Sequence, residues 1–190
     1  MVGDATGKGV PAALVMSTTC GMLQVTAQAL DSFSPGEVLA QVNETLLARI
    51  PPNMFVTCFY AILEPESGRL LYANAGHELP YLRRRNGEAE ELRARGMPLG
   101  LMPGMGYEEK EIELDVGEAA LFYSDGLVEA HDTKGEMFGF PRLRALMAEH
   151  GEEGSLGEFL MEELYSFVGY GWEQEDDITL VTLRHSASLS

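Results

Sequence analysis

Two consecutive prolines, Pro51 and Pro52, separate a helical pattern from a β pattern. Before them, residues 10–30 carry apolar side chains among small ones, which predicts a long and largely buried helix. A second, amphipathic helix is predicted over 34–50, because a capping box that begins at Ser34 precedes apolar residues at helical spacing. After the prolines, β-branched and aromatic residues dominate. The chain must therefore fold by combining helices with strands.

The stretches 55–63 and 69–74 are joined by a turn that ends in glycine, which predicts a β-hairpin. The rest of the chain contains further strand and helix patterns, and no internal sequence repeat stands out. The pattern predicts an α+β fold in which helices lie against antiparallel strands, within one domain spanning 1–190. The further strands are predicted at 80–84, 88–93, 107–114, 119–123 and 178–184, and the further helices at 141–150 and 156–168.

The charge of the chain excludes one large class of partner. Asp and Glu number 30 against 13 Lys and Arg, for a formal net charge of −17, and the carboxylates are spread along the chain. Such a surface repels a phosphate backbone, so we do not expect nucleic acid binding. The one basic cluster is Arg83–Arg85, beside an Asn86-Gly87 turn. We interpret it as the solvated end of a hairpin, with a binding patch as the alternative.

The sequence contains no run of about 18 or more apolar residues and no pattern of a cleavable signal peptide. We therefore expect no membrane span and a soluble, cytoplasmic protein. The two cysteines, Cys20 and Cys58, lie in a helical and a strand pattern. Buried thiols are expected rather than a disulfide framework.

The chain opens with MVGDATGKGVPAALVM, a glycine-rich stretch ahead of the first helix. It is not a phosphate-binding P-loop, since only three residues separate Gly3 from Gly7 and Gly9 stands where Ser or Thr is required. Asp4 taken alone is a residue that caps a turn. The alternative is that it binds a metal together with carboxylates elsewhere in the chain.

Two distant stretches favour the metal. An apolar strand ends at Ser124-Asp125-Gly126, and the adjacent carboxylates of Asp176 and Asp177 precede another apolar strand. If these groups and Asp4 converge at one edge of a sheet, their oxygens suit Mg²⁺ or Mn²⁺, whereas zinc would need His or Cys ligands that these stretches lack. Two such ions can activate a water and hold a phosphoryl group for in-line attack.

Five motifs follow one another along the chain: Gly3–Ala13, Asn74-Ala75-Gly76-His77, Ser124–Glu129, Phe138-Gly139 and Asp176-Asp177-Ile178-Thr179. In this order they resemble the motifs of the bacterial SpoIIE/RsbU-like branch of the metal-dependent type 2C serine/threonine phosphatases. The resemblance runs from Gly3 to about Arg184. It implies a sandwich of two antiparallel β-sheets flanked by helices, in α-β-β-α layers, with two Mg²⁺ or Mn²⁺ ions at one end.

The resemblance also implies roles for individual residues. Asp4 would bridge the two metals, with the backbone carbonyl of Ala5 completing the shell, and Asp125 and Asp176 would be further ligands. Asp177 would lie in the second shell. A metal-bound water would then attack the phosphorus of phosphoserine or phosphothreonine, so that no protein nucleophile is needed.

Two more polar residues have both a functional and a structural interpretation. His77 is either a proton donor to the leaving serine oxygen or a histidine hydrogen-bonded locally in a turn that leaves a strand. Lys8 either meets the substrate phosphate or is a solvated lysine beside a glycine-rich loop. The sequence alone leaves both alternatives open.

Members of this branch act in signalling, and the resemblance implies a STAS-type anti-sigma-factor antagonist as the phosphoprotein substrate and an upstream sensor or receiver domain. The family domain also has an upstream β-hairpin that contributes an aspartate, so the abrupt start predicts a domain incomplete at its N-terminus that lacks the first strands. Exposed sheet edges could then pair two chains into a homodimer. A weakened metal site would leave less than full activity. The alternative function is a catalytically weak or inactive module that acts by protein–protein interaction.

Overall fold

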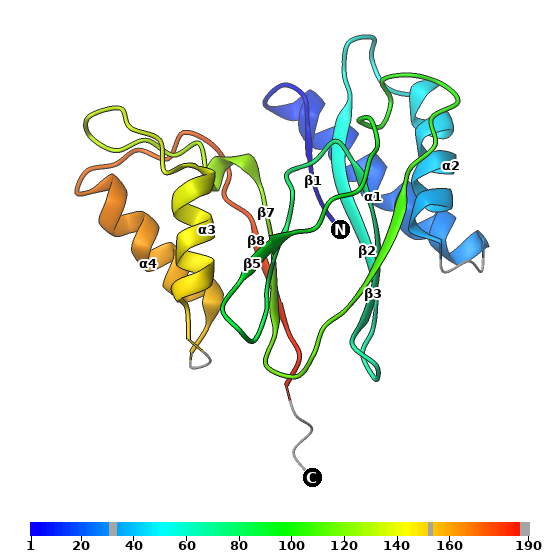
Figure 1. Cartoon of the computed structure of the whole chain (residues 1–190). Coiled ribbons are helices and arrows are strands. Elements are labelled where there is room, and N and C mark those ends of the chain that lie inside the picture. Colours follow the sequence, from blue (N-terminus) through cyan, green and yellow to red (C-terminus); the bar gives the residue numbers. More distant parts are fainter. Residues whose placement is uncertain (31–33, 152–153, 187–190) are drawn as a thin grey trace. The chain divides into compact units, whose positions relative to one another are not determined.

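The computed structural model describes residues 1–30, 34–151 and 154–186, and it divides into two compact units (Figure 1). Unit 1 comprises Met1–His77 and Arg93–Glu113, and unit 2 comprises Glu78–Leu92 and Leu114–Ser190. Each unit has its own antiparallel sheet, its own pair of helices and its own apolar core. The organisation of residues 1–190 as a single domain stays a prediction.

Unit 1 is built on a four-stranded sheet in the order β1-β2-β3-β6. The β2-β3 hairpin keeps its register from Cys58 opposite Ala75 to Glu64 opposite Arg69, as the sequence predicts. Its helices α1 and α2 contact each other and the sheet, so that their apolar sides close the core. The strands are β1 (Val2–Ala5), β2 (Val56–Glu64), β3 (Arg69–Ala75) and β6 (Glu109–Glu113), and the helices are α1 (Val10–Leu30) and α2 (Pro35–Leu47).

The start of α2 confirms that Ser34 caps the helix, as the predicted capping box requires. The Ser34 hydroxyl accepts a hydrogen bond from the Glu37 backbone N–H at 3.1 Å, which satisfies one of the amides that the first helical turn leaves without a partner. Apolar side chains at helical spacing along α2 are fully buried. They are Val38, Leu39, Val42 and Leu46.

Helix α1 is less buried than its composition suggests. Only Val15, Thr19 and Leu23, at intervals of four residues, are buried, whereas Leu14 is 63% and Val25 64% exposed. The prediction of a largely buried helix is wrong, because only this stripe is buried, and the other apolar residues of α1 that pack against the core are partly exposed. Cys20 lies off that stripe and is exposed, so the predicted buried thiol is confirmed only for Cys58.

Within the described residues, α1 is also the one helix that is long and apolar enough to cross a membrane, with a mean hydropathy of 1.3 over its best window. The sequence did not predict a membrane span here, because polar residues such as Ser17 and Gln24 interrupt the apolar residues of α1. Core helices of soluble proteins and signal sequences meet the same criterion.

Unit 2 has a four-stranded antiparallel sheet in the order β5-β4-β7-β8. Helices α3 and α4 cover the sheet face that carries Tyr81, Leu121 and Tyr123, and these side chains share a core with Leu143 and Leu160 of the helices (Figure 1). The Ser155 hydroxyl caps α4 by accepting from the Glu158 N–H, as predicted. The elements are β4 (Tyr81–Arg83), β5 (Ala89–Glu91), β7 (Ala119–Tyr123), β8 (Leu180–Arg184), the short 3-10 helix η1 (Asp125–Leu127), α3 (Gly139–Glu149) and α4 (Leu156–Val168).

The arginine cluster does not form one solvated surface. Arg85 is exposed and the β4-β5 connection turns at Asn86-Gly87, as predicted, but Arg83 is only 9% exposed. Arg83 alternates with Leu82 along β4, and the alternation directs its side chain to the same face as Tyr81, under the helices. The interpretation as a solvated hairpin end is therefore wrong for Arg83.

The α+β class, with two antiparallel sheets accompanied by helices, is confirmed. The predicted strands and helices are all present, most with ends shifted by one to three residues. Strand β1 was not expected, because the opening stretch reads as a turn ahead of a helix. It forms because Val2–Ala5 pairs with Val56–Phe59 of β2, a partner more than fifty residues away.

Candidate metal centre

Asp4 is an exposed residue on β1, at the edge of the unit 1 sheet. It lies opposite Thr57 of β2, whose hydroxyl is 3.4 Å from the Asp4 carbonyl oxygen. The neighbouring position has to be glycine, since a Cβ at Gly3 would lie 2.5 Å from the Thr57 carbonyl oxygen. The close pairing of β1 and β2 therefore fixes the backbone that carries Asp4.

The Ala5 carbonyl points away from β2. The Thr6 N–H donates to the Phe55 carbonyl at 3.0 Å, and hydrogen-bonded and non-hydrogen-bonded pairs alternate along an antiparallel ladder. Ala5 opposite Val56 is thus a non-hydrogen-bonded pair, and β1 is the edge strand. A carbonyl directed outward from a sheet edge fits the predicted role of Ala5 as a ligand through its backbone.

Between Asp4 and α1, the chain turns through Gly7-Lys8-Gly9. Gly7 and Gly9 have φ values of 95° and 75°, a conformation that strongly favours glycine. Lys8 lies exposed between them. This position is compatible both with contact to a substrate phosphate and with a solvated lysine. The glycines serve the turn into the helix.

His77 is only 8% exposed and lies in unit 1, two residues after the end of β3. Its ring nitrogen Nδ1 is 3.0 Å from the Thr57 hydroxyl oxygen. Asn74 fixes its backbone twice, because the His77 N–H donates to Asn74 Oδ1 at 2.7 Å and Asn74 Nδ2 donates to the His77 carbonyl at 2.9 Å. The residue opposite Asp4 is therefore also the residue that orients His77.

In unit 2, the two predicted acidic stretches lie side by side. The Ser124 hydroxyl donates to the Asp177 carbonyl at 2.9 Å and accepts from the Thr179 N–H at 2.9 Å. A Cβ at Gly126 would lie 2.6 Å from the same Asp177 carbonyl oxygen. Ser124 and Gly126 thus hold the end of β7 against the start of β8, and they bring Asp125 and Asp176 into one part of the fold.

The carboxylates of this part differ in their environments. Asp125 is half-buried, and its Oδ1 accepts from the Gly126 N–H at 2.8 Å. Asp176 is exposed, and its Oδ1 accepts from the Asp177 N–H at 2.8 Å. The Asp177 backbone carbonyl accepts the hydrogen bond from Ser124, and its side chain is exposed. That this side chain supports the metal ligands without binding the metal stays a prediction.

Glu78, Asp125 and Glu129 form an acidic cluster in unit 2, and the sequence did not point to Glu78. Burial raises the pKa of its carboxyl above the usual 4.5, and the negative charges of Asp125 and Glu129 raise the pKa further. Crowded carboxylates of this kind are the environment that a divalent cation stabilises. Spacing in the sequence gives no signal for Glu78, because its proximity to Asp125 and Glu129 exists only in the folded unit.

We expect Glu78→Gln to raise the melting temperature of the metal-free protein at pH 7 by about 1–3 °C. The raised pKa means that the folded state holds the Glu78 proton more tightly than the unfolded chain does. Stability is therefore lost as the pH rises from below 4.5 through the raised pKa, and the glutamine removes this loss. Thermal unfolding in EDTA from pH 4 to pH 7 measures it, with Glu66→Gln as the control. Equal pH profiles for Glu78→Gln and the wild type would contradict the expectation.

The structure thus brings some predicted residues together and leaves others in separate units. Asp125, Asp176 and Asp177 belong to unit 2, whereas Asp4, Ala5, Lys8 and His77 belong to unit 1. Among the described residues, no three His, Cys, Asp or Glu side chains form a group that could hold a metal ion by themselves. The donors present are carboxylate and carbonyl oxygens, which fit Mg²⁺ or Mn²⁺ rather than zinc.

Comparison with known proteins identifies the family. The profile of Stage II sporulation protein E (SpoIIE) matches residues 1–186. The phosphoserine phosphatase RsbU of Bacillus subtilis (strain 168) is 29% identical over 188 residues, which are 96% of this chain and 54% of RsbU. The chain therefore spans about half the length of that relative.

Two solved structures share the fold. The SiaA-PP2C domain of Pseudomonas aeruginosa superposes with a TM-score of 0.80 at 22% identity, covering 96% of this chain and 72% of that one. The RsbU and RsbW domains of Rv1364c from Mycobacterium tuberculosis give a TM-score of 0.78 at 26% identity, covering 97% of this chain and 51% of that one. The profile match shows that the chain belongs to the SpoIIE family, and the solved structures show that it shares the fold of PP2C-type domains.

Proposed function

We propose that this chain is a metal-dependent protein phosphatase that hydrolyses phosphoserine or phosphothreonine on a regulatory protein. The observation that carries the proposal is the contact between Ser124-Asp125-Gly126 and the Asp176–Thr179 stretch, which gathers hard oxygen donors beside the crowded Glu78 carboxyl. The phosphoserine phosphatase RsbU supplies the reaction class.

The residues that we propose to hold the ions are Asp4, Asp125 and Asp176, with the Ala5 carbonyl as a further donor. RsbX, another protein of this fold with a TM-score of 0.68 at 16% identity, has been solved in complex with magnesium. When bound, two divalent ions lower the pKa of water and neutralise charge on a phosphoryl group. Asp177 would help to orient these ligands without binding the ions itself.

His77 and Lys8 would act on the substrate itself. Thr57 beside Nδ1 holds the His77 ring, and we propose that the imidazole donates a proton to the leaving oxygen of serine or threonine. Lys8 would bind a phosphate oxygen from the glycine-rich turn. Only 8% of His77 is exposed, and this burial helps to keep its ring in one orientation, as a positioned proton donor requires.

The substrate that we propose is a STAS-type anti-sigma-factor antagonist, with a sensor or receiver domain upstream in the full-length protein. The solved Rv1364c structure contains an RsbU and an RsbW domain, which supports a place among such regulatory partners. The formal net charge of −17 supports a protein rather than a nucleic acid as the partner.

Release of inorganic phosphate from a phosphoserine peptide tests the function. We expect release by the purified chain in Mn²⁺ and loss of at least about 90% of it in excess EDTA, because without the ions nothing in the proposed site lowers the pKa of the attacking water. Restoring Mn²⁺ should restore the rate. No release above the buffer rate in Mn²⁺ would leave the inactive interaction module as the better account.

A further inference from the structure

Two arginines of unit 2 are linked through one small residue across the sheet. In the β4-β7 pairing Arg83 lies opposite Ala119, and in the β7-β8 pairing Ala119 lies opposite Arg184. Residues directly opposite each other in neighbouring strands project to the same face of a sheet. Both arginines therefore project to the face under α3 and α4, and the alanine between them leaves space above the sheet.

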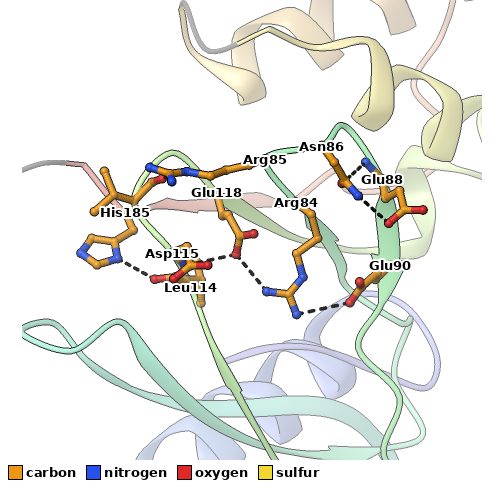
Figure 2. A network of polar contacts seen from close by, with 10 residues as sticks. Arg84, Arg85, Asn86, Glu88, Glu90, Leu114, Asp115, Glu118 and His185 are labelled. Atoms are coloured by element: carbon orange, nitrogen blue, oxygen red, sulfur yellow. Dashed lines mark hydrogen bonds and ion pairs between the residues drawn. The ribbon is translucent and has the colours of Figure 1, made fainter.

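The guanidinium of Arg83 has an unsatisfied hydrogen-bond donor among the described residues. Arg83 is 9% exposed, and within the described part of the chain its buried Nε donates no hydrogen bond. Arg84 projects to the opposite face, where its guanidinium contacts Glu118 at 2.9 Å and Glu90 at 3.4 Å (Figure 2). Glu118 adjoins Ala119, so strand alternation keeps this carboxylate off the face of Arg83.

A cavity of about 110 Å³ lies beside the two arginines. One water requires roughly 10–15 Å³, so a tetrahedral oxyanion fits with space to spare. Among the described residues, those that line the cavity include no Asp or Glu, although the chain as a whole is strongly acidic. They are Arg83, Gly117, Ala119, His150, Gly151, Gly154, Ser155, Leu156, Thr182, Leu183 and Arg184.

Two more groups of the cavity favour an anion. Ser155 and Leu156 form the beginning of α4, a 13-residue helix whose N-terminal amides attract negative charge. His150 ends α3, and burial lowers the pKa of its imidazole, as do the positive charges of Arg83 and Arg184. The ring is thus close enough to sense both guanidinium groups.

We propose that this cavity is a binding site for a phosphate group, held by Arg83, Arg184 and the N-terminus of α4. The group is either free inorganic phosphate or the phosphate of a phosphorylated side chain, since both present the same tetrahedral oxyanion. The site lies wholly within unit 2, uses none of the proposed metal ligands, and does not rest on the proposed phosphatase function.

Binding is tested on the metal-free chain in EDTA, where the carboxylates of the candidate metal centre hold no cation that could attract phosphate. Inorganic phosphate and O-phosphoserine are titrated at constant ionic strength against sodium chloride, and the melting temperature is recorded. We expect a saturable rise with phosphate and none with chloride. Tighter binding of O-phosphoserine assigns the site to a phosphorylated side chain, and equal or tighter binding of inorganic phosphate assigns it to the free ion.

Arg184→Gln is the main variant, because Arg184 is exposed and its loss leaves the core intact. We expect its phosphate affinity to fall at least tenfold, whereas Arg144→Gln, an exposed arginine of α3, should bind as the wild type does. If the Arg83→Gln protein folds, it should bind phosphate as weakly as Arg184→Gln does. Because Arg184→Gln is expected to fold, the test stands even if Arg83→Gln does not.

NMR titration of the histidines gives an independent readout. Saturating phosphate should raise the pKa of His150, since an anion favours the imidazolium. The ring signals of His131, whose Nδ1 lies 3.0 Å from Glu175 Oε2, are the reference and should not move when phosphate is added at constant pH. The proposal is overturned by the absence of saturable phosphate binding, or by phosphate binding that Arg184→Gln leaves unchanged.

Discussion

Asp125→Asn is expected to lower kcat/KM for a phosphoserine peptide in Mn²⁺ on the order of 10²-fold or more, since even residues that only support metal ligands affect activity by 10–100-fold. Asp125 is half-buried at the end of β7, and the Ser124 and Gly126 contacts fix its backbone against the start of β8. The asparagine keeps the shape and the capacity to accept from Gly126 N–H while removing the charge. The loss therefore reports on the charge.

Asp115→Asn is the matched control for this substitution, because Asp115 is an exposed aspartate of the same unit, outside the acidic cluster. It should change kcat/KM by less than about twofold, as surface substitutions away from a site do. Circular dichroism and the melting temperature establish that Asp125→Asn is folded. Equal activity of Asp125→Asn and the wild type would remove Asp125 from the reaction.

Gly126→Ala is expected to destabilise the fold by about 2 kcal/mol, or roughly 4–8 °C in melting temperature. The added Cβ would lie 2.6 Å from the Asp177 carbonyl oxygen, a backbone atom that cannot rotate away. The displacement would also disturb the 2.9 Å hydrogen bond from Ser124 to that carbonyl. Activity should fall together with stability, because the same contact positions Asp125 beside Asp176.

Gly157→Ala is the control for this steric argument. Gly157 lies in α4, and a Cβ there would meet no atom closer than 3.9 Å. Alanine has a higher helix propensity than glycine, so this variant should be as stable as the wild type or more so. A Gly126→Ala protein that melts at the wild-type temperature would show that β7 and β8 do not meet as closely as described.

The elements that sequence reasoning predicted well are those whose causes are local. Residues 119–123 form a strand because five consecutive apolar residues are buried in the sheet, and α4 begins where its capping serine lies. Strand β1 was missed because Val-Gly-Asp-Ala has no pattern of its own and becomes a strand only by pairing with β2. The exposed side of α1 was also missed, because composition does not tell which side of a helix finds a partner.

The same distinction applies to the site. Asp4, Asp125, Asp176 and the other motif residues could be nominated from the sequence because each lies within a recognisable motif. Glu78 could not, because its environment depends on Asp125 and Glu129, which lie far along the chain. The arginine cluster was noticed, but the separation of Arg83 from Arg84 and Arg85 depends on its pairing with Ala119 and could not be foreseen. Sequence spacing does not record such proximity.

Isothermal titration of Mn²⁺ into the metal-free chain is the most direct test of the central proposal, that Asp4 and Asp125 are metal ligands. We predict saturable binding to the wild type and to Asp115→Asn, and an affinity at least about tenfold lower in Asp4→Asn and in Asp125→Asn, since each removes a charged oxygen ligand. Absence of saturable binding, or equal binding by all four proteins, would contradict it.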